Sequence, residues 1–122
     1  MSYHSIANII SKASDCLDDS MLLLSEESYD AALNRSYYAM FHSIQALLLT
    51  ISFVAKSHSG AHNAFHKQFI LTQISPRNLG LVLKRTFEKQ QFGDYDYDEV
   101  LFEDAKESVE DARLFSKQLS SI

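Results

Sequence analysis

Residues 31–51 read AALNRSYYAMFHSIQALLLTI, a stretch rich in the Ala, Leu, Met, Tyr and Phe residues expected of a helix that packs a core. An α-helix turns by about 100° per residue, so residues three, four and seven positions apart share one side. One side of this stretch is apolar and predicts contact with the core. Its residues are Leu33, Tyr37, Met40, Phe41, Ile44, Leu47, Leu48 and Ile51.

Two polar residues on the opposite side of this helix need an explanation. Arg35 and His42 are seven positions apart, and seven helical steps return to within about 20° of the same direction. Small and apolar residues surround them, so this second side is also predicted to be buried. In a small bundle the covering surface could be another subunit. We therefore predict a two-fold dimer with Ala39, His42, Ala46 and Leu49 at its interface.

The whole chain predicts one all-α domain over residues 1–122, an antiparallel bundle of about five helices, four long and one short. One proline, three glycines and no run of period two argue against strands. A polar loop is expected at 57–60 and a turn at 92–98. The expected helices cover residues 3–24, 29–54, 61–71, 76–91 and 98–119, the fourth beginning with Ser75 as cap and Pro76 as first helical residue.

Several features point to a soluble cytoplasmic protein. The single cysteine, Cys16, excludes an internal disulfide and is expected to be a structural thiol. The N-terminus lacks the basic and apolar regions of a secretory signal. The most apolar run, residues 44–55, is too short to cross a bilayer.

Charge is distributed unevenly along the chain, whose net charge is −5. Residues 94–122 carry nine acidic and three basic side chains and predict an acidic last helix. That helix could be a solvated face, a mimic of a nucleic-acid backbone or a docking surface for a basic partner. Residues 56–93 carry six cations and one acid, so binding of nucleic acid remains open. The cations are Lys56, Lys67, Arg77, Lys84, Arg85 and Lys89.

Three histidines recur at four-residue steps, namely His58, His62 and His66. Histidines at such spacing on a helix can share a zinc ion. The first is expected in the loop, and no nearby carboxylate or cysteine completes a ligand set, so we predict no metal. A helix cap, or a phosphate contact beside Lys56 and Lys67, is the expected role.

The segments NRSYYAMFH at 34–42, KSHSG at 56–60 and FEKQQFGDYDYD at 87–98 together resemble the small stand-alone HEPN-domain proteins. The resemblance runs from about Ile6 to Phe115 and keeps the order and spacing of these blocks. Such proteins are all-helical and are partners of minimal nucleotidyltransferases in bacterial and archaeal gene pairs. The resemblance therefore implies such a transferase as a possible antitoxin partner.

The resemblance also implies a catalytic pair. The HEPN motif is an arginine followed, after four to six residues, by a histidine, and Arg35 and His42 match its long end; Ser36 is a weaker match to the polar residue that commonly follows the arginine. Active members are dimeric, metal-independent endoribonucleases whose motifs meet at the subunit interface, and no cofactor is expected. Residues expected to contact the RNA or nucleotide are Asn34, Tyr38, Lys56, His58 and Lys67, with His58 favoured over the later histidines because it lies in a recurring block.

The residue types suit this chemistry. Histidine can move a proton near neutral pH, and arginine can meet the charge that develops on phosphate oxygens. Two alternatives remain open from the sequence: a non-catalytic HEPN module that binds a nucleotide or a partner nucleotidyltransferase, and an adaptor that only dimerises.

Overall fold

The computed structural model describes residues 5–95 and 99–119, and within these ranges the chain forms five α-helices and no strand. The elements are α1 (Ile6–Ser25), α2 (Tyr29–Leu49), α3 (His58–Phe65), the π-helical segment η1 (His66–Ile70), α4 (Arg77–Tyr95) and α5 (Phe102–Leu119). The predicted all-α bundle of four long helices and one short helix is confirmed. In the described part of the chain, no helix has a stretch long and apolar enough to span a membrane.

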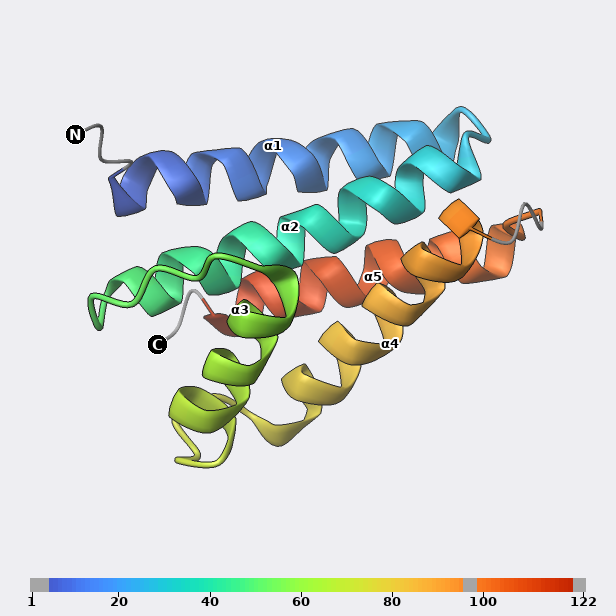
Figure 1. The fold of residues 1–122 in the computed structure, drawn as a ribbon. Helices are drawn as coiled ribbons and strands as arrows, with labels where there is room; N and C mark the ends of the chain where they lie inside the picture. The colour runs from blue at the N-terminus through green and yellow to red at the C-terminus, as the bar shows by residue number, and fades with distance from the viewer. Residues whose placement is uncertain (1–4, 96–98, 120–122) are drawn as a thin grey trace.

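Helix α2 lies at the centre of the bundle, where it contacts α1, α3, α4 and α5. Figure 1 shows α1 running antiparallel to α2 along nearly its whole length, with α5 beside α2 and α4 crossing at an angle. The short helix α3 and η1 lie beyond the end of α2 in sequence and fold back over it. The central helix is therefore the element on which the others are assembled.

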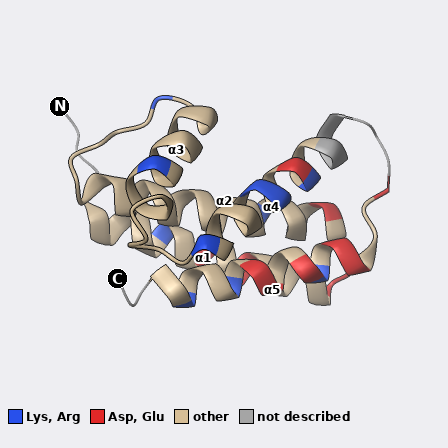
Figure 2. Ribbon diagram, turned by 90° about the horizontal axis from the view of Figure 1, so that it is seen from below, with Lys and Arg blue, Asp and Glu red and all other residues tan. Residues whose placement is uncertain are grey.

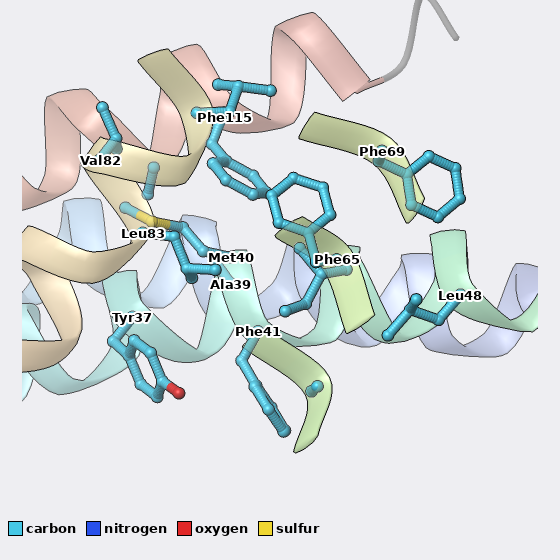
Figure 3. Close-up of a cluster of buried hydrophobic side chains, with 14 of the residues drawn as sticks. Tyr37, Ala39, Met40, Phe41, Leu48, Phe65, Phe69, Val82, Leu83 and Phe115 are labelled. Carbon is cyan, nitrogen blue, oxygen red and sulfur yellow. The ribbon is translucent and has the colours of Figure 1, made fainter. Parts of the chain in front are cut away.

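Most of the main hydrophobic cluster lies between α2 and the helices that follow it, and Cys16 of α1 also belongs to it. Phe65, Met40 and Phe115 are almost completely buried and come from α3, α2 and α5 (Figure 3). Leu83 from α4 belongs to the same cluster. Tyr37 and Phe41 project to another side of α2, one helical turn apart, toward the start of α3.

Two helices end without glycine, which explains one difference from the sequence prediction. Ser52 has a positive φ of 60°, its N–H bonds to the carbonyl of Leu49, and the N–H of Phe53 bonds to the carbonyl of Leu48. This is the hydrogen-bond pattern of a Schellman helix end. It stops α2 at Leu49, so the predicted extension to residue 54 is wrong. Glu27, with φ 63°, ends α1 in the same way.

Helix α3 begins earlier than predicted, because the polar block at 57–60 is a helix start and not a loop. The Oγ of Ser57 accepts a hydrogen bond from the N–H of Gly60 at 3.0 Å. A Cβ at position 60 would lie only 2.9 Å from that oxygen, so glycine leaves room for the cap. His58, expected in a loop, is consequently the first residue of α3.

The fourth and fifth helices also differ in their limits. Helix α4 continues to Tyr95, past the predicted end at residue 91, so residues 92–95 are helical and only 96–98 of the expected turn lie outside the described residues. Helix α5 begins at Phe102, a few residues after the predicted start.

Much of the acidic character of α5 is matched by cations on α4 (Figure 2). The guanidinium of Arg85 lies 2.6 Å from a carboxylate oxygen of Asp111 and 3.4 Å from Glu107. Lys89 pairs with Glu107 and lies 3.8 Å from Asp104. The hydrogen bond from Lys89 lowers the pKa of Glu107, and the hydrogen bond to Asp111 raises that of Arg85. Arg85 and Lys89, two cations of the basic stretch, are therefore already paired with carboxylates of the same chain.

Two leucines of α4 provide a matched test of the core. Leu83 is 3% exposed and Leu81 is 67% exposed. We expect Leu83→Ala to lower the free energy of unfolding by about 2–5 kcal/mol, because it leaves a cavity among packed rings. Leu81→Ala should change it by less than about 0.5 kcal/mol. Urea unfolding followed by circular dichroism measures both, and equal losses would contradict the packing of α4.

Candidate functional site

The candidate site lies on the side of α2 that carries Arg35 and His42, both of which are half-buried. The guanidinium of Arg35 donates from Nε and Nη2 to the side-chain oxygen of Asn34, at 3.1 and 2.7 Å. Its Nη1 lies 3.9 Å from the Sγ of Cys16 on α1. Asn34 therefore orients the arginine, while burial raises the pKa of the Cys16 thiol and keeps it protonated.

Tyr38 joins the two residues of the predicted pair. The guanidinium carbon of Arg35 lies 5.2 Å from the centre of the Tyr38 ring, and the His42 ring lies 5.9 Å from it. These contacts follow from the helical spacings of three and four residues. Because Tyr38 also meets the His58 ring edge-on at 5.9 Å, it connects α2 with the start of α3.

His42 is held in a setting that favours its neutral form. It makes no side-chain hydrogen bond with any residue in the described ranges. Burial is the main cause that lowers its pKa below the ordinary value, followed by the positive charges of Lys12, Arg35 and His58. A neutral imidazole at physiological pH can accept a proton.

Lys12 was missed by the sequence analysis. It is exposed on α1, and only the packing of α1 on α2 brings its charge near His42. Nothing in the spacing of residues 12 and 42 signals this proximity. Lys12 and Arg35 both place a positive charge near His42, which suits a site for phosphate.

The other residues predicted to bind substrate are distributed differently. Asn34 and Tyr38 contact Arg35, and His58 contacts Tyr38, so these three join the site. Lys56 and Lys67 are exposed on the chain before and after α3. Among the described residues, no hydrogen bond or ion pair links either lysine to Arg35 or His42.

His58 and His62 are held by a residue of α2. The hydroxyl of Tyr37 lies 2.7 Å from Nδ1 of His58 and 2.9 Å from Nε2 of His62. Burial and the charge of His58 lower the pKa of His62 to about 4. His66 is exposed and takes no part in these contacts. Within the described ranges, no group of three or more histidine, cysteine or acidic side chains is placed to hold a metal ion.

The residues predicted at a dimer interface fall into two groups. Ala39 and Ala46 are each only 3% exposed within a single copy of the chain. Packing within the chain already buries these two alanines, so they leave almost no surface for the predicted interface. His42 and Leu49 are half-buried and keep some surface available to a partner.

The chain belongs to the HEPN domain family, whose match covers residues 6–122. It is 42% identical over 84 residues to a "UPF0332 protein" of Thermotoga maritima, covering 69% of this chain and 64% of that protein. It is 37% identical over 91 residues to "Putative toxin MJ0142" of Methanocaldococcus jannaschii, covering 75% and 62%, respectively. A second protein of that organism, "Putative toxin MJ0605", is 29% identical over 110 residues, covering 90% and 82%. The matched segment thus spans less than two thirds of the first two relatives.

The electrostatic contribution of Lys12 can be measured directly. We expect Lys12→Gln to raise the pKa of His42, because removing a nearby positive charge makes the imidazolium less unfavourable. Titration of the His42 ring protons by NMR follows this change. Lys56→Gln is the matched control and should leave the His42 titration unchanged; an unchanged titration in Lys12→Gln would contradict the placement of α1.

Proposed function

We propose that the protein is a metal-independent endoribonuclease, the toxin component of a toxin–antitoxin pair, acting as a homodimer with Arg35 and His42 as its catalytic pair. The observation that carries the proposal is that a guanidinium, 5.2 Å away, and an imidazole with a lowered pKa, 5.9 Å away, both contact the Tyr38 ring. Membership of the HEPN family and similarity to proteins named as toxins support it.

The proposed reaction uses the 2′-hydroxyl of RNA as the nucleophile. Neutral His42 accepts the proton of this hydroxyl while its oxygen forms a bond to the adjacent phosphorus. The bond from phosphorus to the 5′-oxygen breaks, the leaving oxygen takes up a proton, and a 2′,3′-cyclic phosphate remains. Arg35 stabilises the negative charge that develops on the non-bridging oxygens.

The contacts of Arg35 are compatible with this task. A guanidinium has five N–H donors, and Asn34 receives two of them through one oxygen. Donors on Nη1 and Nη2 remain for phosphate, while Tyr38 supports the face of the group. Lys12 would add long-range attraction for the RNA backbone without touching the reacting atoms.

A second copy of the chain would complete this site. His42 and Leu49 retain exposed surface beside Arg35's helix face, and a two-fold axis there would bring two copies of the pair together. The partner antitoxin in this proposal is a minimal nucleotidyltransferase, as in the gene pairs of the resembling proteins. The alternative is a non-catalytic module that binds a nucleotide or this transferase. It would use the same cations and Tyr38, and the cleavage experiment distinguishes it from a ribonuclease.

The activity is tested with purified protein and single-stranded RNA. We expect cleavage in the presence of EDTA that leaves 2′,3′-cyclic phosphate ends. Arg35→Ala and His42→Ala should each slow cleavage on the order of a hundredfold or more, since each removes a group needed in the transition state.

The control for this experiment is Arg77→Ala, which removes an exposed cation at the start of α4. It should cleave as the wild type does, and circular dichroism should show unchanged helix content in all variants. A loss of only tenfold in the pair variants would indicate a binding role. No cleavage, together with tight binding of a nucleotide or transferase, would favour the non-catalytic module.

The dimer is tested by sedimentation at tens of micromolar protein. Leu49→Lys should convert a dimer into a monomer, because it places a charge in the proposed interface while the position is exposed enough to keep the fold. Ala46→Glu is unsuitable, since a charge at that buried position would disrupt the monomer itself. Leu81→Lys, on the exposed side of α4, is the matched control. A monomeric wild type would contradict the proposed assembly.

A further inference from the structure

The hydroxyl of Tyr37 is shared by two histidines. Tyr37 has no exposed surface, and its oxygen lies within hydrogen-bond distance of His58 Nδ1 and His62 Nε2, at 2.7 and 2.9 Å. Burial raises the pKa of this tyrosine well above its ordinary value, so the hydroxyl keeps its proton. One buried hydroxyl thus links α2 with the first and second turns of α3.

Aromatic rings restrict the two histidines. The ring of Phe41 stacks on His58 with centroids 4.2 Å apart and planes 17° apart. The ring of Phe87 from α4 meets His62 at 4.9 Å and nearly at right angles. Figure 3 shows Tyr37 and Phe41 projecting side by side from α2. The imidazoles are therefore held in orientations that keep their bonds to the hydroxyl.

The hydroxyl has only one proton to donate, so the two histidines cannot play the same part. If Tyr37 donates to Nε2 of His62, then Nδ1 of His58 must carry a proton and donate to the tyrosine oxygen. If Tyr37 donates to Nδ1 of His58, then His62 must carry its proton on Nε2. The first arrangement is the only one that a doubly protonated His58 can adopt.

We propose that Tyr37 and His62 are positioning residues that hold a proton on Nδ1 of His58, so that Nε2 of His58 is a second proton-transfer group for the site. This inference rests on the proposed ribonuclease activity of Arg35 and His42. It assigns His58 the role of the acid that protonates the leaving oxygen. Nδ1 of His58 faces the oxygen of Tyr37. A hydrogen-bond acceptor in this position determines which ring nitrogen of a histidine keeps its proton.

The surroundings of His58 support this assignment. It is half-buried, and the titratable groups that act on it or contact it are Tyr37, Tyr38 and His42 from α2 and His62 from α3. Helix α4 contributes the uncharged ring of Phe87. The rings of His42 and His58 each lie 5.9 Å from the ring of Tyr38, so both imidazoles border the same side chain. His62 stays neutral because burial opposes its protonation, so it remains able to accept from Tyr37.

The proton balance of the proposed step is simple. Neutral His42 takes the proton of the 2′-hydroxyl, and the 2′-oxygen bonds to phosphorus. Doubly protonated His58 gives its Nε2 proton to the 5′-oxygen as the phosphorus–oxygen bond breaks. His58 is left neutral with its proton on Nδ1, still donating to Tyr37, so no proton need move within the buried array.

The array is tested first by NMR of the imidazole nitrogens, which needs no RNA. In the wild type at about pH 8, neutral His58 and His62 should each carry the proton on Nδ1. In His62→Leu the hydroxyl has no other acceptor, so it should donate to His58 and move the His58 proton to Nε2. His66→Asn, a matched change one turn further along, should leave both tautomers as in the wild type.

Two results would overturn the array. One is a wild-type neutral His58 with its proton on Nε2; the other is an unchanged His58 tautomer in His62→Leu. Tyr37→Phe is an independent test, because it keeps the ring but removes the oxygen. The tautomers of His58 and His62 should then no longer depend on each other. An unchanged spectrum in that variant would also overturn the proposal.

The role in cleavage is tested with a changed leaving group. His58→Gln should cleave ordinary RNA on the order of a hundredfold more slowly, whereas an RNA with sulfur in place of the 5′-oxygen should be cleaved at close to the wild-type rate, because thiolate leaves without a proton. His42→Ala should remain slow on both substrates. Equal losses on both substrates in His58→Gln would exclude the acid role. If the wild type cleaves neither RNA, the ribonuclease assignment and the role of His58 fail together, while the tautomer result still decides whether the array exists.

Discussion

The burial of α2 among α1, α3, α4 and α5 is the constraint on which the rest of the structure depends. A polar side chain on such a helix must find a partner or lie at an edge. Ser36 bonds to the carbonyl of Leu33 in its own helix, and Tyr37 finds its partners on α3. Arg35 and His42 lie at the edge, half-exposed, and are available for a ligand. The same packing that builds the core therefore determines which polar groups can act.

The cations of α4 and Arg35 of α2 have different partners. The cations of α4 pair with carboxylates of α5, so their contribution is largely local, and exposed pairs of this kind add little to stability. Arg35 has no carboxylate partner among the described residues and relies on Asn34 and Tyr38. Positive potential therefore persists where His42 lies, which is the condition for attracting phosphate.

The contacts made at the start of α3 explain which residue types occur there. Ser57 caps the helix, Gly60 leaves room for that cap, and His58 and His62 then face Tyr37 one helical turn apart. Histidines at this spacing are also typical of metal sites. Here, both nitrogens nearest α2 are taken by one hydroxyl, and the third histidine of the series points elsewhere on the exposed surface.

The sequence by itself determined the class of fold, the apolar side of α2 and the shared side of Arg35 and His42, because helical periodicity depends only on positions along one element. The sequence pattern placed the end of α2 too late in the chain. The residue with a left-handed backbone there is Ser52, whereas such a helix end is normally recognised in a sequence by a glycine. Only the tertiary structure decided that Ala39 and Ala46 are buried within one chain, that Lys12 acts on His42, and that Tyr37 joins His58 to His62. These features arise between helices, where the angle and register of packing bring together residues from separate elements, and no spacing within a single helix encodes them.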